Sequence, residues 1–151
     1  MSVDVFVAAK TLGECCGWRV SNLTMQKLLY LANLDYMGKN GKPLIGSPFE
    51  AWDYGPVQPS LYYKLRRFGA RDVYDVFFNE ECLTLDNDEK EFDVLNRMSK
   101  LWHVKPGVLV RFTHGDGGGW ATVYEPGVRS RIIPNKFIKA EYKLMMEKAK
   151  S

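Results

Sequence analysis

The sequence predicts a mainly α-helical protein: a single compact helical domain around a central buried helix, with a few short strands. Residues 24–37 carry apolar side chains around most of a helix, which is typical of a helix with neighbours on several sides. Other segments with helical spacing start at capping residues or prolines and stop at glycines. The 151 residues, 46% of them hydrophobic and 26% charged, suffice for one core, so we expect one domain over residues 1–151.

Two helices are expected in the first third of the chain. The first runs from Val3 to Cys16, and Ser2 is its predicted N-terminal cap, because a serine hydroxyl can accept from the first free N–H groups of a helix. The second runs from Thr24 to Met37 and is the central helix. Glycines favour helix termination, and three follow these segments: Gly17 after the first, Gly38 and Gly41 after the second.

The central helix keeps one narrow polar strip. Its members are Gln26, Lys27, Tyr30 and Asn33. Residues three, four and seven positions apart return to the same side of a helix, so these side chains lie together. We interpret the strip as a candidate surface for a partner.

A short extended segment and a third helix follow. The aromatic content of Phe49–Tyr54 favours a strand-like conformation, and Gly55-Pro56 then predicts a turn. Pro59 fits the first turn of a helix, where its missing N–H costs nothing. We therefore predict a helix over residues 60–68, closed by Gly69.

The next pattern is ambiguous. Residues 70–85 fit either an extended segment or one or two helical turns. Asp86 with Glu89 three residues later resembles a capping box, in which two side chains satisfy the first N–H groups of a helix. We predict that this helix continues to about His103.

The last third combines a strand-like segment, a loop and a helix. β-Branching alone favours a strand over residues 106–112, and the glycines of residues 115–119 predict a flexible loop. We expect Trp120 to pin the chain onto the core, because a buried indole brings a large apolar area. Pro134 opens a terminal helix from Asn135 to about Lys148.

The charge balance disfavours nucleic acid as a partner. The net charge of +3, from 21 Lys and Arg against 18 Asp and Glu, is small and evenly spread. Clustered cations and stacking aromatics keep nucleic-acid binding open as an alternative: Arg66, Arg67, Arg71, Arg129, Arg131, Tyr62 and Tyr63. Asp72 and Asp75 follow the first arginines and would weaken their potential.

Cysteine and histidine usage indicates a reduced, metal-free protein. Cys15, Cys16 and Cys82 cannot all pair, and vicinal cysteines almost never bridge each other, so a reducing cytoplasm fits best. His103 and His114 lie far from the cysteines in sequence, and we predict neither a metal nor a cofactor. The sequence contains neither a signal-peptide pattern nor an apolar stretch of about 20 residues, so we expect no membrane association.

Catalysis has little support. His114 could be a general base, but a Thr-His pair at the end of an element more often forms local hydrogen bonds. The loop over residues 114–120 could wrap a phosphate, yet it lacks the Lys-Ser/Thr ending of a P-loop. We therefore predict that the protein is not an enzyme.

The segment Trp52–Tyr62 has two interpretations. It holds two prolines, a glycine and three aromatic residues, and rigid aromatics lose little entropy when they bind a partner. The same residues would also serve to turn the chain into a helix while Trp52 fills the core. The sequence leaves interface and core as rivals here.

Three parts of the sequence together resemble one known family. They are Leu23–Ala32 (LTMQKLLYLA), Phe49–Tyr62 (FEAWDYGPVQPSLY) after Gly41–Leu44, and Thr113-His114 ahead of Trp120. The combination of a Gln-Lys-Leu-Leu-Tyr helix with a Tyr-Gly-Pro-Val-Gln-Pro turn is specific, and the similarity covers about residues 5–140. On this basis the chain is identified as a member of the Panacea, or SocA-like, antitoxin domain family.

The resemblance implies a mostly helical protein without catalysis that neutralises a cognate toxin by direct protein–protein binding. Its relatives belong to bacteria, archaea and phages, including prophages. The first alternative is a proteolytic adaptor that delivers a toxin or another protein to an AAA+ protease; the second is a phage- or prophage-encoded nucleic-acid-binding regulator. The resemblance also predicts a short helix over Val108–Phe112 in place of a strand.

We choose the candidate partner-binding residues from the polar strip, the aromatic loop and the family motif. The partner is expected near the Trp52–Tyr62 loop and the adjacent strip of the central helix. The candidates are Gln26, Lys27, Tyr30, Trp52, Asp53, Tyr54, Pro56, Tyr62 and Arg66.

Overall fold

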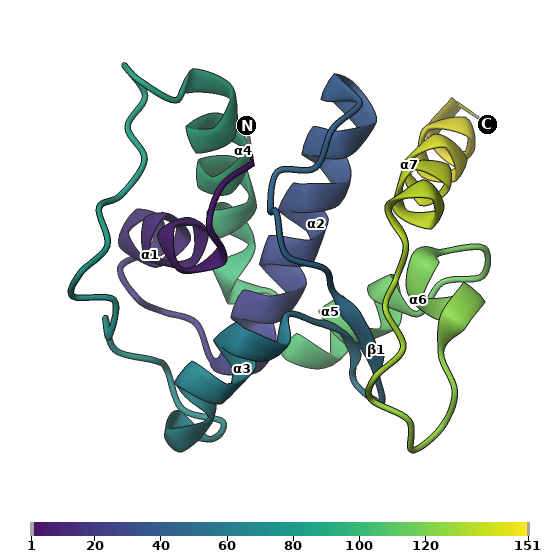
Figure 1. The fold of residues 1–151 in the computed structure, drawn as a ribbon, viewed down its shortest axis with the longest axis horizontal. Coiled ribbons are helices and arrows are strands. Elements are labelled where there is room, and N and C mark those ends of the chain that lie inside the picture. Colours follow the sequence, from purple (N-terminus) through teal and green to yellow (C-terminus); the bar gives the residue numbers. More distant parts are fainter. Residues whose placement is uncertain (1, 151) are drawn as a thin grey trace.

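A computed structural model describes residues 2–150 and is mainly helical, as predicted (Figure 1). The only sheet in this range is a two-stranded hairpin. In chain order the elements are α1 (Val5–Cys16), α2 (Asn22–Asn40), β1 (Glu50–Trp52), β2 (Gly55–Val57), α3 (Pro59–Leu65), the 3-10 helix η1 (Arg66–Phe68), α4 (Glu89–Ser99), the 3-10 helix η2 (Lys100–His103), α5 (Pro106–Thr113), α6 (Gly119–Val123) and α7 (Asn135–Lys150).

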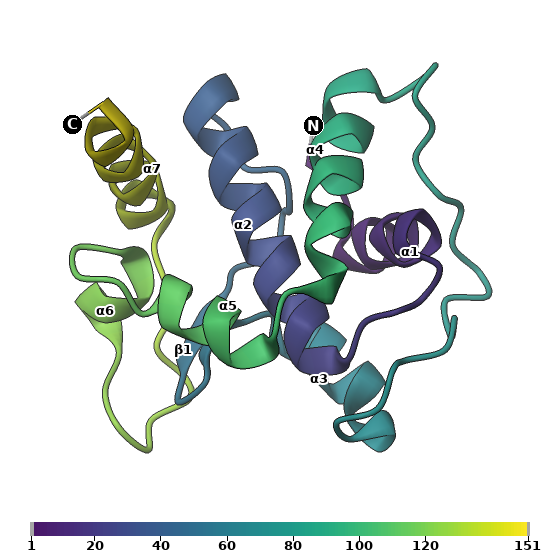
Figure 2. The ribbon, with the colours of Figure 1, turned by 180° about the vertical axis from the view of Figure 1, so that it is seen from behind.

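Helix α2 is the centre of the fold. It contacts α1, α3, α4, α5, α7 and β2. Figures 1 and 2 show α1 and α4 on one side of α2, and α6 and α7 on the other. Leu28, Leu29 and Ala32 are fully buried, which confirms the central buried helix that the apolar pattern predicts.

The start of α1 differs from the prediction. Asp4, and not Ser2, is the N-cap: its carboxylate accepts from the N–H groups of Phe6 and Val7 at 3.0 and 3.4 Å. A carboxylate suits this position better than a hydroxyl, because it also neutralises the positive end of the helix dipole. The helix ends at Gly17, as predicted.

Gly38 does not end the central helix, contrary to prediction. It lies inside α2, and the ring of Tyr142 on α7 packs against it so closely that a Cβ at this position would overlap the ring. Gly41 is the true C-cap, with φ 76°. The first glycine is therefore present for helix packing and the second for the left-handed turn.

The strands β1 and β2 form an antiparallel hairpin in which Glu50 pairs with Val57 and Trp52 with Gly55. The turn lies at Asp53 and Tyr54, two positions before the predicted Gly55-Pro56 turn, and Gly55 supplies a φ of 106° as β2 begins. The C-terminal segment runs beside β1, because the N–H of Ala51 donates to the Arg131 carbonyl at 2.9 Å. The predicted third helix is confirmed as α3 with η1.

In the second half of the chain the structure shows which conformation the ambiguous segments adopt. Residues 70–85 form neither a helix nor a strand. Helix α4 begins at Glu89, and its N-cap Asp88 makes no side-chain capping bond, so the predicted start at Asp86 is wrong. Its predicted end near His103 is met by η2. The terminal helix is confirmed as α7.

Helix α5 confirms the expected short helix at Val108–Phe112. Pro106 occupies its first turn, and Leu109 and Thr113 on one face are buried. This packing outweighs the β-propensity of the valines, which is a weak preference that depends on context. The glycines after α5 form a short turn, closed by a bond from the Gly118 N–H to the Gly115 carbonyl at 3.1 Å, and α6 begins at Gly119.

Two absences apply to residues 2–150. No helix in this range combines the length and the apolar character that crossing a bilayer requires. The same range contains no cluster of three or more His, Cys, Asp or Glu side chains placed to hold a metal ion.

Candidate partner-binding pocket

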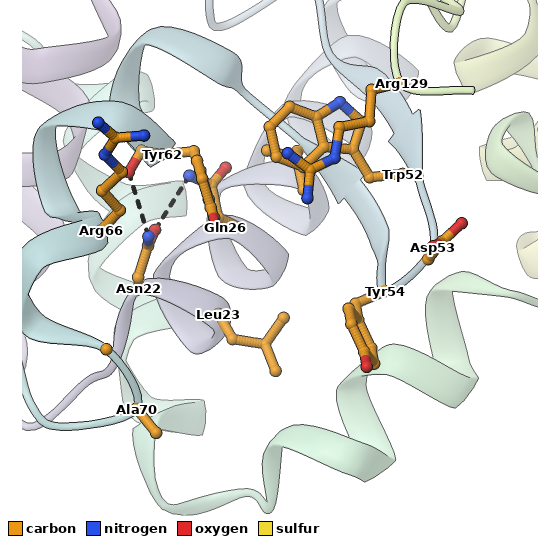
Figure 3. A pocket seen from close by; sticks show the side chains of 12 residues that line it. Asn22, Leu23, Gln26, Trp52, Asp53, Tyr54, Tyr62, Arg66, Ala70 and Arg129 are labelled. Atoms are coloured by element: carbon orange, nitrogen blue, oxygen red, sulfur yellow. Dashed lines mark hydrogen bonds between the residues drawn. The ribbon is translucent and has the colours of Figure 1, made fainter. Parts of the chain in front are cut away.

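A pocket of about 340 Å³ lies where the hairpin, the start of α2 and the α3–η1 segment meet (Figure 3). Six of the nine candidate residues line it: Gln26, Trp52, Asp53, Tyr54, Tyr62 and Arg66. The remaining lining residues are Asn22, Leu23, Val57, Gly69, Ala70 and Arg129. The fold therefore brings the start of the central helix and the aromatic loop to one site, whereas the other three candidates, Lys27, Tyr30 and Pro56, do not line it.

Aromatic rings form one wall of the pocket. The rings of Trp52 and Tyr62 meet edge to face with 4.8 Å between centroids, and Tyr62 meets Tyr63 in the same way at 5.4 Å. The indole N–H of Trp52 donates to the Glu50 carboxylate at 2.9 Å, and only 5% of the residue is exposed. Edge-to-face packing fixes both rings. The wall is thus preformed.

Two amide side chains brace the pocket. Asn22 donates to the Tyr62 carbonyl at 3.3 Å, and its own oxygen accepts from Gln26 at 3.3 Å (Figure 3). The oxygen of Gln26 accepts from the main-chain N–H of Gln58 at 2.7 Å, across the start of α3. These bonds tie α2 to the loop that carries the aromatic rings. They also leave the two amides engaged with the protein itself.

Two arginines stand at the rim on opposite sides of the pocket. The guanidinium carbon of Arg129 lies 4.3 Å from the Trp52 ring centroid, and that of Arg66 lies 5.4 Å from the Tyr63 ring centroid. Within residues 2–150 neither arginine forms an ion pair. Stacking on a ring holds a guanidinium in place without neutralising it.

Arg129 is held at the pocket by the loop that carries it. The Asp53 carboxylate accepts from the Tyr124 hydroxyl at 2.6 Å and from the Gly127 N–H at 3.5 Å. These bonds, with a smaller contribution from the charge of Arg129, lower the pKa of Asp53. The sequence indicates Arg129 only as one of the cations of the nucleic-acid alternative, because no periodic pattern links residue 129 to the hairpin.

The polar strip of α2 is not a surface, and that interpretation is wrong. Gln26, Lys27, Tyr30 and Asn33 are all buried. Their polar atoms satisfy groups from distant parts of the chain: Lys27 donates to the Pro56 carbonyl at 2.7 Å, Tyr30 donates to Glu141 at 2.6 Å, and Asn33 accepts from the N–H groups of Leu44 and Ile45 at 2.9 and 3.1 Å. The strip holds the surrounding loops on the central helix.

Lys27 is the extreme member of the strip, with 0% of its surface exposed. Burial disfavours the ammonium and lowers its pKa to about 7. Nearby, His114 stacks on Trp120 at 3.6 Å between ring centroids, and its buried Nε2 has no partner among the described residues. Burial, assisted by the charge of Lys27, lowers the pKa of His114. Neither Lys27 nor His114 lines the pocket.

The nine candidates therefore divide by exposure. Tyr54 is 70% exposed, Asp53 and Arg66 are also exposed, and Tyr62 is half-buried. Trp52 and Pro56 are buried with the strip residues. The base of the aromatic loop thus belongs to the core, and its tip and outer wall face solvent.

Comparison with known proteins identifies the family of this chain. A profile of the family described as "Antitoxin SocA-like, Panacea domain" matches residues 25–121. The chain belongs to this family. It is also similar to "Antitoxin SocA" of Caulobacter vibrioides (strain NA1000 / CB15N), with 26% identity over 136 residues, covering 82% of this chain and 72% of the relative. No solved structure matches significantly.

The matched range of the SocA-like family contains most of the pocket. It includes most of α2, the hairpin and the α3–η1 segment. Arg129 on the rim and Glu141, the partner of Tyr30, lie beyond it. The matched range therefore supplies the aromatic wall, whereas Asn22 and Leu23 precede it and the C-terminal segment adds one of the two rim cations.

Proposed function

We propose that this SocA-like protein is an antitoxin that neutralises a cognate toxin by direct protein–protein binding in the cytoplasm. The observation that carries the proposal is the preformed aromatic pocket with two arginines at its rim that form no ion pair within residues 2–150. Rigid aromatics and arginines are the residue types that dominate binding energy in protein interfaces. The name of the relative in Caulobacter vibrioides supports the same role.

A binding role fits the pocket better than catalysis. Its lining holds no His, Cys, Ser or Lys side chain that could act as a nucleophile or a general base. His114, the one candidate base from sequence, is stacked on Trp120 away from the pocket. We propose a non-enzymatic protein that needs no cofactor.

The decisive experiment is coexpression with the gene that neighbours this one. The neighbour should arrest growth when expressed alone, and coexpression of this chain should restore growth while the two proteins copurify. Tyr54→Ala or Tyr62→Ala should weaken copurification by about 2 kcal/mol or more, with little change in melting temperature. Tyr74→Ala is the matched control, because Tyr74 is as exposed as Tyr54 but does not line the pocket.

Two outcomes would replace the proposal. If rescue requires an AAA+ protease and the toxin level falls, the protein acts as an adaptor for proteolysis. If the purified chain is retained on DNA or RNA in a salt-sensitive manner and Arg66→Ala with Arg67→Ala abolishes retention, it is a nucleic-acid-binding regulator.

A further inference from the structure

We infer that the pocket takes an acidic linear segment of the partner, with one large apolar side chain inserted and carboxylates on either side held by Arg66 and Arg129. The inference rests on the proposed function and names the chemistry that its pocket selects. It follows from three properties of the site: the state of its polar groups, the position of its charges and the way its ring faces are covered.

The interior of the pocket favours an apolar side chain. Leu23, Val57 and the ring of Tyr62 offer apolar surface. The amides of Asn22 and Gln26 are engaged with main-chain groups and with each other, so they add little hydrogen bonding to a ligand. At about 340 Å³ the space is at the small end of ligand sites, which begin at roughly 300 Å³, and suits one large side chain with adjoining backbone.

The two arginines at the rim add a second requirement, which is negative charge on the bound segment. Arg66 from η1 and Arg129 from the loop before α7 flank the pocket. Neither forms an ion pair within residues 2–150, although the charge of Arg129 also acts on the Asp53 carboxylate. A planar guanidinium that is held against a ring is oriented to receive a carboxylate through two parallel bonds. Acidic residues on both sides of the inserted side chain would satisfy both arginines.

The aromatic faces argue against a nucleic-acid strand as the occupant. Base stacking needs an open ring face, but Arg129 covers the Trp52 ring, whose edge-to-face contact with Tyr62 orients the second ring. The site therefore fits a peptide better than an oligonucleotide.

The test uses three labelled peptides and the purified full-length chain. The probes are Gly-Asp-Glu-Phe-Asp-Glu-Gly, the same peptide with Lys and Arg in place of the acidic residues, and the acidic peptide with Ala in place of Phe. Fluorescence anisotropy gives the affinities, and the indole N–H signal of Trp52 in the NMR spectrum reports the site. We expect the first peptide to bind at least fivefold more tightly than the other two, and its affinity to fall with salt.

Substitutions at the rim locate the charges. Arg66→Ala should lower the affinity for the acidic peptide at least threefold. Arg67→Ala removes an equal charge from the same 3-10 helix but not from the pocket, so it should change this affinity less than about 1.5-fold. Arg129→Gln should lower the affinity for the acidic peptide as much as Arg66→Ala does. Because glutamine keeps a planar group beside Trp52, an unchanged melting temperature separates lost charge from lost packing.

Several results would overturn the inference. They are equal binding of the basic peptide, equal losses in Arg66→Ala and Arg67→Ala, binding of an oligothymidylate to the same indole signal in place of the peptide, or no peptide binding at millimolar concentration. If any of these occurs while the chain still rescues growth, the acidic-segment inference fails and the antitoxin proposal stands. If the peptides bind as expected but no neighbour is neutralised, the antitoxin proposal fails and the pocket specificity stands.

Discussion

The indole N–H of Trp120 donates to the main-chain oxygen of Trp52 at a nitrogen–oxygen distance of 2.7 Å. This bond joins the short helix α6 to the end of β1, directly behind the aromatic wall of the pocket. It confirms that Trp120 pins the chain onto the core. The stability of the pocket therefore also depends on Trp120, a residue that does not line it.

Trp120→Phe should therefore destabilise both the fold and the hairpin. The phenyl ring keeps much of the apolar contact but leaves the buried Trp52 carbonyl without its donor, a loss of about 1–3 kcal/mol. Chemical denaturation measures the global loss, and amide hydrogen exchange over residues 50–57 measures the local loosening. Trp102→Phe is the control, because Trp102 is partly exposed and lies away from the pocket. Equal effects of the two substitutions would contradict the role of the bond.

Gly38→Ala should destabilise the packing of α7 on α2. Alanine is the better helix former by about 1 kcal/mol, yet here its methyl group would overlap the ring of Tyr142, and overpacking of this kind costs roughly 1–3 kcal/mol. The measurement is a double-mutant cycle in urea. In a Tyr142→Ala background the substitution should become neutral or stabilising. A loss that persists in that background would mean that the ring contact is not its cause.

The predictable part of this fold is the part determined by local sequence. The end of α1 at Gly17 and the start of α7 at Asn135 follow from a glycine and a proline, and these act within a few residues. The side chain of Lys27 shows the limit of such reasoning: its polar group predicts exposure, but the carbonyl that satisfies it belongs to Pro56 in another element. Whether a polar residue is buried depends on a partner that only the tertiary fold supplies.

The candidate site was predictable to a similar extent. The aromatic loop and the start of the central helix carry the family motif, and both reach the pocket. Arg129 was not predictable as a member, because its position depends on the path of an irregular segment held by Asp53. Loop geometry of this kind has no periodic signature in the sequence.

Tyr30→Phe should test the buried bond between α2 and α7. The hydroxyl donates to Glu141 at 2.6 Å in a fully buried position, and the same carboxylate oxygen accepts from the Gly119 N–H at 2.9 Å. Removing the hydroxyl leaves a buried carboxylate with one donor fewer, so we expect a loss of about 1–3 kcal/mol by chemical denaturation. Tyr36→Phe removes a similar bond, at 2.7 Å, to Glu91, and should cost less because the Glu91 carboxylate is partly exposed and water can replace the lost donor. The reverse order would contradict this account.

Lys27→Met should change how the stability depends on pH. In the folded protein the pKa of Lys27 is about 7, whereas an unfolded lysine keeps its proton to about pH 10.5. Between these values the unfolded chain binds more protons, so the contribution of Lys27 to stability is greatest above pH 10.5 and is lost as the pH falls to 7. Removing the amine removes this dependence. The free energy of unfolding of the wild type, measured against that of Lys27→Met, should therefore rise from pH 7 to pH 10 by on the order of 3 kcal/mol. The pKa of His114, which Lys27 also lowers, lies below this pH range, and the remaining titrating groups are present in both proteins and cancel in the difference. Parallel curves would therefore show that the buried amine keeps its proton throughout this range.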